Sequence, residues 1–151
     1  MTEEVTILKA AILIDGTGKE PLRNAVVVIE GSRIKEVRME GKVKIPGGRA
    51  IDAREETVMP GLIDLHGHYT WSAKRQSGLC LSELQPIPIT VLEAARALQL
   101  TLEMGYTTVR DCGALAHIDM ALKKVTETRL IPGPRFITCG KIISITGGHG
   151  D

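Results

Sequence analysis

Apolar residues in the first third of the chain fall in short runs that turn residues separate. Four of these runs predict strands, at residues 5–14, 25–30, 33–38 and 49–52. Gly31 and Ser32 lie between the second and third runs and suit a two-residue hairpin of type II′. The polar stretch 52–57 is interpreted as a linker. The pattern therefore predicts an all-β segment over residues 1–57, with a scaffold role and no chemistry.

Beyond residue 57 the pattern changes to an alternation of apolar runs and helical spacing. Strands are predicted at 58–68, 106–112 and 135–143, and helices at 94–104 and 114–128. Thr90 and Glu93 fit a capping box at the start of the first helix, and Gly105 fits its end. Alternating strands and helices predict an α/β region, 58–151, with a parallel sheet and right-handed crossovers.

Two histidines end the first strand of this region. Side chains alternate along a strand, so His66 and His68 are expected on one side, with Asp64 further down the same face. Two imidazoles so placed can reach a single metal ion. The alternative is that the two histidines bind no metal and are simply polar residues at the end of a strand, which is also common. An apolar strand that delivers both at its carboxyl end matches the active-site geometry of a parallel barrel, which favours metal ligation.

The residues around this pair carry a family resemblance. Pro-Gly-Leu-Ile-Asp-Leu-His-Gly-His, 60–68, resembles the Pro-Gly-x-Ile-Asp-x-His-x-His signature of the amidohydrolase superfamily of metal-dependent hydrolases. The resemblance implies that His66 and His68 bind the more buried of one or two metal ions, Zn²⁺ or another divalent cation. Further stretches at 102–111, 133–135 and 146–151 look like the branch of imidazolonepropionase-like enzymes and dipeptidases that cleave Xaa-Pro, Xaa-Arg or Xaa-Lys.

The resemblance also implies the fold and the activity. Residues 1–57 would be part of an N-terminal β-sandwich, and residues 58–151 the first three βα units of an incomplete TIM (β/α)8 barrel. A complete barrel takes about 250 residues, so the chain is interpreted as an N-terminal portion. The implied activity is cleavage of a carbon–nitrogen bond, in a dipeptide or a cyclic amide, by metal-activated water.

An alternative is a truncated chain or subunit without catalysis, which needs a partner to complete the barrel. The remaining groups that the family implies, a carboxylated lysine, two more histidines and a catalytic aspartate, would come from later strands. No catalytic residue is therefore placed in this chain. Two histidines are fewer than the three protein ligands of a typical catalytic zinc site. We expect the isolated chain to have little or no hydrolase activity.

Two other residues, His149 and Tyr69, are candidates for substrate contact. His149 lies in a glycine-rich loop after the third predicted strand, where loops build the site face of a barrel. It is interpreted as a substrate contact, with a plain surface histidine as the alternative. Tyr69 and Trp71 follow the histidine pair directly. They could shape a pocket, with Tyr69 touching substrate, or simply pack.

Charged residues near the pair have two possible roles. Asp64 could orient one of the histidine ligands. Arg110 and Asp111 lie near the end of the predicted strand 106–112. They either lie in the pocket, where Asp111 would support a metal ligand, or serve as structural charges. His117 falls in a helical pattern and is interpreted as a helix residue, not as a ligand.

Composition narrows the class of partner. The chain of 151 residues carries a formal net charge of +1 and is 43% hydrophobic but only 3% aromatic, which argues against nucleic acid and membrane surfaces as partners. Its three cysteines form no metal or disulfide spacing, and the acidic N-terminus resembles no signal peptide. A cytoplasmic protein is expected. Its partners would be a small-molecule or dipeptide substrate and either other copies or the remainder of a longer chain.

Overall fold

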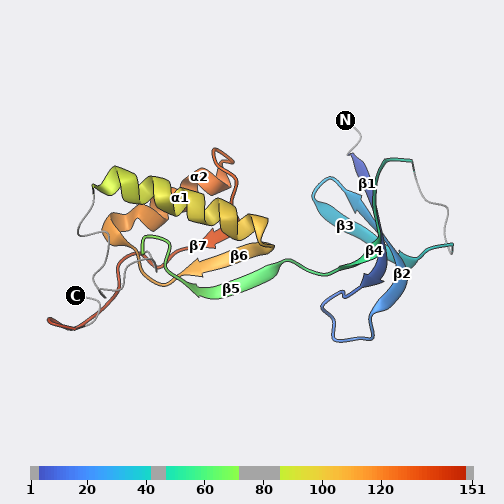
Figure 1. Ribbon diagram of the computed structural model, residues 1–151, viewed down its shortest axis with the longest axis horizontal. Coiled ribbons are helices and arrows are strands. Elements are labelled where there is room, and N and C mark those ends of the chain that lie inside the picture. Colours follow the sequence, from blue (N-terminus) through green and yellow to red (C-terminus); the bar gives the residue numbers. More distant parts are fainter. Residues whose placement is uncertain (1–3, 42–46, 72–85, 149–151) are drawn as a thin grey trace. The chain divides into compact units, whose positions relative to one another are not determined.

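The computed structural model describes residues 4–41, 47–71 and 86–148. Its contacts divide the chain into two compact units, Met1–Pro60 and Gly61–Asp151. The first unit is a mixed β-sheet and the second is a parallel sheet with connecting helices (Figure 1). This is the mixed α/β architecture predicted from the sequence, in which a β segment precedes parallel βα units.

The first unit holds a four-stranded sheet with the order β3-β2-β1-β4. Its strands are β1 (Val5–Leu13), β2 (Leu22–Glu30), β3 (Arg33–Met39) and β4 (Arg49–Val58). Strand β1 runs antiparallel to β2 and parallel to β4, and β2 runs antiparallel to β3. Gly31 has φ +57 in the two-residue turn between β2 and β3, which confirms the predicted hairpin.

Both faces of this sheet bury apolar side chains, because β2 is apolar on both sides. One cluster contains Ile7, Val26 and Val28. The other contains Leu13, Ala25 and Val27. A strand buried on both faces shows a continuous apolar run in place of alternation, as the sequence of β2 does.

The prediction of a linker at 52–57 is wrong. Strand β4 continues to Val58 and pairs with β1 from Thr6 opposite Arg49 to Leu13 opposite Val58, with a shift of register between Ala53 and Thr57. Most β4 side chains are exposed, so its polar composition costs little. The backbone hydrogen bonds to β1 decide the conformation here, and a sequence pattern does not reveal such a partner.

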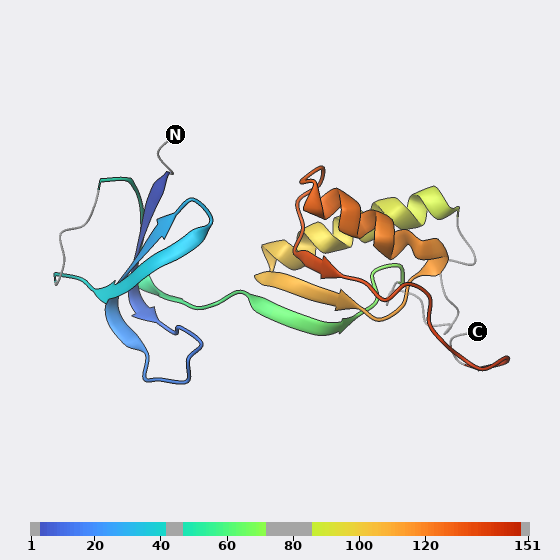
Figure 2. The same ribbon diagram turned by 180° about the vertical axis from the view of Figure 1, so that it is seen from behind.

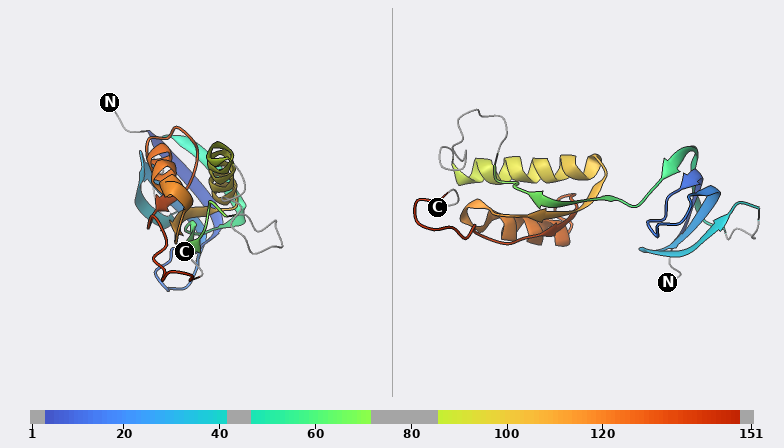
Figure 3. Two further views of the ribbon diagram at one scale, coloured as in Figure 1. Left: turned by 90° about the vertical axis from the view of Figure 1, so that its left-hand side faces the viewer. Right: turned by 90° about the horizontal axis from the view of Figure 1, so that it is seen from below.

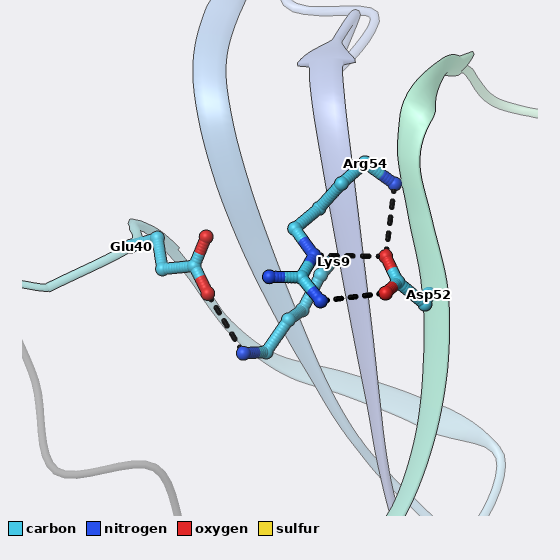
Figure 4. A network of polar contacts seen from close by, with 4 residues as sticks. All are labelled: Lys9, Glu40, Asp52 and Arg54. Carbon is cyan, nitrogen blue, oxygen red and sulfur yellow. Dashed lines mark hydrogen bonds and ion pairs between the residues drawn. The ribbon is translucent and has the colours of Figure 1, made fainter.

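Polar side chains on β1, on β4 and directly after β3 form the network in Figure 4. Arg54 Nε and Nη2 donate to the two carboxylate oxygens of Asp52 at 2.9 and 2.6 Å. Lys9, the register partner of Asp52 on β1, donates to Glu40 Oε1 at 2.7 Å. The hydrogen bonds from Arg54 lower the pKa of Asp52 from 3.8 to about 2, and the bond from Lys9 lowers the pKa of Glu40.

Removing the guanidinium is expected to restore the ordinary titration of this carboxyl. In Arg54→Gln, the pKa of Asp52 should rise from about 2 toward 3.8, as followed by carbon-13 carboxyl NMR. Glu40 is the internal control, because its main partner is Lys9. An unchanged pKa of Asp52 in Arg54→Gln would contradict the pairing.

The same pair makes a pH-dependent contribution to stability. Because the pKa of Asp52 is lowered in the folded state, the pair stabilises the protein above pH 3.8, and the effect is lost as pH falls toward 2. The effect is small because both groups are exposed.

The second unit is a three-stranded parallel sheet with the order β5-β6-β7. Its elements are β5 (Leu62–Gly67), α1 (Ile87–Glu103), β6 (Tyr106–Asp111), the short 3₁₀ turn η2 (Leu115–His117), α2 (Ile118–Glu127) and β7 (Arg135–Ile137). Helices α1 and α2 lie side by side on the same face of this sheet (Figures 1, 2 and 3). Within the described ranges, no helix is both long and apolar enough to cross a membrane.

The core of this unit lies between the sheet and the two helices. It buries one residue pair on α1, one pair on α2 and one residue each on β6 and β7: Ala94, Leu98, Ile118, Leu122, Val109 and Phe136. Every second residue of β6 faces this core, so Val109 and Asp111 are fully buried while Arg110 is exposed. The helix-facing side of the sheet is therefore the packed side.

Both helices begin at residues that differ from the prediction. Helix α1 starts at Ile87 after Pro86, so Thr90 lies buried inside the helix and not at its N-cap. Pro88 is tolerated because the first turn has no partner for its missing N–H. Helix α2 starts at Ile118, because Ala116 and His117 have the left-handed values φ +48 and +56.

Strand β7 is shorter than predicted, and β5 is more exposed. Beyond Ile137, Gly140 adopts φ +79, and its N–H and C=O bond to Asp119 Oδ2 and to the N–H of Ala114. These bonds replace a continued strand ladder. The apolar run of β5 is typical of a buried strand, yet Ile63 and Leu65 are 61% and 56% exposed. Among the described residues β5 pairs only with β6, which leaves these side chains uncovered.

Candidate metal-binding site

The two histidines lie at the carboxyl end of β5. Their ring centroids are 5.3 Å apart, with the planes inclined at 73°. The register of β5 against β6 shifts between Asp64 and Gly67, so simple alternation does not hold along this part of the strand. The two rings are therefore close because the strand end is irregular. For the same reason, the register of β5 against β6 does not establish the prediction that Asp64 lies on the same strand face as the two histidines.

The segments that follow β5 and β6 are joined to each other by hydrogen bonds. The N–H of Cys112 donates to the carbonyl of Gly67 at 2.9 Å. The N–H of Leu115 donates to the buried hydroxyl of Thr70 at 3.2 Å. These two hydrogen bonds fix the main chain that follows the histidines.

The ring of His68 is held by the segment after β6. Its Nδ1 lies 3.2 Å from the carbonyl oxygen of Gly113. A carbonyl oxygen only accepts, so Nδ1 carries a proton in this contact, and in the neutral imidazole Nε2 keeps its lone pair for a metal ion. Gly113 is required at this position, because it has φ +149 and a Cβ there would lie 2.1 Å from Ile142 Cγ1.

The carboxylate of Asp111 holds the main chain next to both partners of the contact between His68 and Gly113. Asp111 is fully buried, and it accepts hydrogen bonds from the N–H of Tyr69 at 3.0 Å and of Gly113 at 2.8 Å. Burial raises the pKa of Asp111 from its ordinary value, against the lowering effect of the two backbone bonds. Of the two roles considered for Asp111, the structural one has direct support in these contacts. Its support of a ligand stays a prediction.

Asp64 and Arg110 act on the backbone of β5. Asp64 Oδ1 accepts from the N–H of His66 at 3.0 Å, so this carboxylate holds the main chain of His66 and not its imidazole. Arg110 Nε donates to the carbonyl of Leu65 at 2.6 Å, which ties β6 to β5 one residue before the histidine. The proposed role of Asp64 toward a metal ligand stays a prediction.

The two aromatic residues after the histidines lie in different surroundings. Tyr69 packs against the helix–sheet core, edge-on to Phe136 with centroids 5.3 Å apart, and burial raises the pKa of its phenol. This is the packing alternative considered from the sequence, and substrate contact by Tyr69 stays a prediction. Trp71 stacks on His68, with centroids 4.5 Å apart and an interplanar angle of 14°. His149 lies outside the described residues.

Sequence reasoning missed two residues that shape this region. Gly113 supplies the carbonyl that orients His68. Asp119 is fully buried, its Oδ2 accepts from the N–H of Gly140 at 2.7 Å, and its Oδ1 has no partner in the described part of the chain. An acidic residue in the first turn of a helix is a recognisable signal. It was missed because α2 was predicted to begin four residues earlier.

The donor set fits a divalent metal in chemistry, but among the described residues it is incomplete in number. Two imidazoles lie close together and the tautomer of His68 leaves Nε2 available, as zinc ligation requires. Within residues 4–41, 47–71 and 86–148, no group of three or more His, Cys, Asp or Glu side chains could hold a metal ion. These residues would therefore contribute part of a metal site.

Comparison with known proteins gives one family match and several relatives. The model of the amidohydrolase family matches residues 57–151, more than half of the chain. An imidazolonepropionase of Anaeromyxobacter dehalogenans (strain 2CP-C) is 36% identical over 64 residues, covering 40% of this chain and 15% of that protein. A dihydroorotase of Leifsonia xyli subsp. xyli (strain CTCB07) is 26% identical over 132 residues, covering 76% of this chain and 28% of that protein.

Solved structures with the same fold extend over nearly the whole chain. A Xaa-Pro dipeptidase with methionine bound in its active site has a TM-score of 0.85 and 28% identity, covering 98% of this chain and 36% of its own. A prolidase in complex with N-methylphosphonate-L-proline has a TM-score of 0.83 and 38% identity, covering 97% and 34%. The chain thus spans about a third of the length of these structures and less of the two curated relatives.

Proposed function

This chain belongs to the amidohydrolase family, and on that premise we propose that it forms part of a metal-dependent hydrolase that cleaves a carbon–nitrogen bond. Its contribution is His66 and His68 as two ligands of a divalent metal, with Zn²⁺ the first candidate. The observation that carries the proposal is the pair of imidazoles at the end of β5, with His68 Nδ1 bonded to a carbonyl so that Nε2 is free.

The residues of this chain would hold and orient the ligands. The carbonyl of Gly113 keeps the proton of His68 on Nδ1, and Asp111 fixes the backbone on both sides of that bond. Asp64 fixes the main chain of His66. A divalent metal bound here would supply a water of lowered pKa, about 7 for zinc, and would polarise the scissile carbonyl.

The proposed substrate is a small amide, either a dipeptide or a cyclic amide. The matched structures include a Xaa-Pro dipeptidase and a prolidase, and a dihydroorotase is among the relatives. His149 and Tyr69 remain proposed substrate contacts. The second candidate function is a non-catalytic chain that binds metal only with a partner, either further copies or the remainder of a barrel. The incomplete donor set among the described residues favours it for the 151-residue chain alone.

Zinc binding tests the proposal directly. We expect His66→Ala and His68→Ala each to weaken zinc binding by more than about tenfold in calorimetric titration, because even the partners of metal ligands contribute about 10- to 100-fold. His117→Asn is the matched control: this histidine is exposed and left-handed at φ +56, a conformation that asparagine accepts. Its zinc affinity should equal that of the wild type. Equal affinity in all four proteins would refute ligation by the pair.

Native mass spectrometry with added zinc separates the two candidate functions. Retained zinc and turnover of Xaa-Pro dipeptides by the chain alone would support a self-sufficient hydrolase. Zinc retained only in an oligomer or in a complex with a partner would support the second candidate. We expect little or no turnover by the 16.3 kDa chain alone, because a catalytic zinc site has three protein ligands.

A further inference from the structure

Trp71 is the single tryptophan of the sequence, and it lies on the ring of His68. The two rings are nearly parallel, at 14°, with centroids 4.5 Å apart. The ring of His66 meets the same imidazole edge-on, at 73° and 5.3 Å. His68 is therefore the middle ring of three, and its hydrogen bond to Gly113 is a third contact.

These contacts restrain different motions of the imidazole. The bond from Nδ1 to the Gly113 carbonyl fixes one ring atom, yet the ring can still swing about that atom. An indole stacked on the ring face opposes this swing, because tilting the imidazole would separate the two planes. The terminal torsion of histidine is broad and intrinsically loose, so a packing contact is needed to select one orientation.

We propose that Trp71 is a positioning residue for His68: the stacked indole and the Gly113 carbonyl together hold the imidazole with Nδ1 protonated and Nε2 directed to the metal. The inference deepens the proposed function and rests on it. Trp71 itself touches neither the metal nor the substrate in this proposal. It belongs to the segment joined to the loop after β6 through Thr70, whose hydroxyl accepts from the N–H of Leu115, so its position is supported by the fold.

The first test measures the tautomer and the ring-proton chemical shifts of His68 in the absence of metal. In long-range proton–nitrogen NMR spectra at a fixed pH where imidazole is neutral, wild-type His68 should show the Nδ1–H tautomer and ring protons shifted upfield by the indole. Trp71→Phe should keep the tautomer, because a smaller aromatic ring still stacks. Trp71→Leu should lose the upfield shift and mix the two tautomers, while the signals of His117 stay unchanged. Backbone spectra establish that each variant is folded.

The second test measures the consequence for metal binding. Trp71→Leu should weaken zinc binding about 2- to 10-fold, the range expected for one aromatic pair, and Trp71→Phe should lie between it and the wild type. An unchanged tautomer in Trp71→Leu, or an unchanged zinc affinity beside an altered tautomer, would overturn the inference. If the wild type itself binds no zinc, the proposed function fails, and the NMR result alone decides whether Trp71 positions the ring.

Discussion

Leu98→Ala is expected to lower the free energy of unfolding of the second unit by about 2–5 kcal/mol. Leu98 is fully buried on α1, where it packs with Leu122, Val109 and Phe136 between the helices and the sheet. Truncation removes its burial and leaves a cavity that the surrounding α/β layers can close only in part. Leu98 thus belongs to the packing that holds α1 on β6.

The same helix supplies a matched control. Leu92 is 70% exposed, so Leu92→Ala makes the same chemical change at the same helix with almost no loss of burial. It should change the unfolding free energy by less than about 0.5 kcal/mol. Urea unfolding followed by NMR at amides of α1 and β6 would report the second unit separately from the first. Equal effects of the two substitutions would mean that α1 does not pack as described.

Asp111→Ala is expected to cost about 2–4 kcal/mol of unfolding free energy in the same unit. The substitution leaves two backbone N–H groups, of Tyr69 and Gly113, without their acceptor, and each such loss costs about 1–3 kcal/mol when buried. Asp111→Asn keeps one acceptor oxygen and almost the same volume, so its loss should be about half as large. Denaturation curves of the two variants beside the wild type provide the measurement.

The pH dependence of stability gives an independent test of this buried carboxyl. Burial raises the pKa of Asp111 above 3.8, so the folded protein takes up this proton at higher pH than the unfolded chain. The stability that results is fully present below pH 3.8 and is lost as pH rises through the folded pKa. The unfolding free energy of the wild type minus that of Asp111→Asn should therefore increase as pH is lowered toward 3.8. A decrease over that range would show that the folded pKa is lowered.

Loss of the Asp111 carboxylate should also weaken zinc binding at the candidate metal-binding site. Its two hydrogen bonds hold the residue after His68 and the residue whose carbonyl orients the His68 ring. Zinc affinity in Asp111→Asn should consequently fall even at temperatures where the variant remains folded. This separates a contribution to the site from a purely structural one.

Much of the fold could be read from local patterns, because those patterns reflect local physics. The continuous apolar run of β2 predicts a strand, and Gly31 predicts the hairpin that follows it. The motif 60–68 led to the amidohydrolase family, which the match over residues 57–151 confirms. The helical periodicity before Gly105 likewise identified α1, apart from the residues at which it begins.

The errors arose where a partner distant in sequence sets the conformation. Strand β4 extends through a polar stretch because β1 offers it a hydrogen-bonding edge. Strand β7 ends early because Gly140 bonds to Asp119 and Ala114 and leaves the strand direction. Neither partner is visible in the local sequence, since these hydrogen bonds join segments that are distant along the chain.

By itself the sequence determined the family, the order of strands and helices, and the identity of the two histidines. The orientation of those histidines was decided only by the tertiary structure. The carbonyl of Gly113, 45 residues away along the chain, selects the tautomer of His68, and the stacked ring of Trp71 faces the same imidazole. A motif specifies which side chains are present. The direction of a lone pair depends on hydrogen bonds and ring contacts that exist only once β5 and β6 lie side by side.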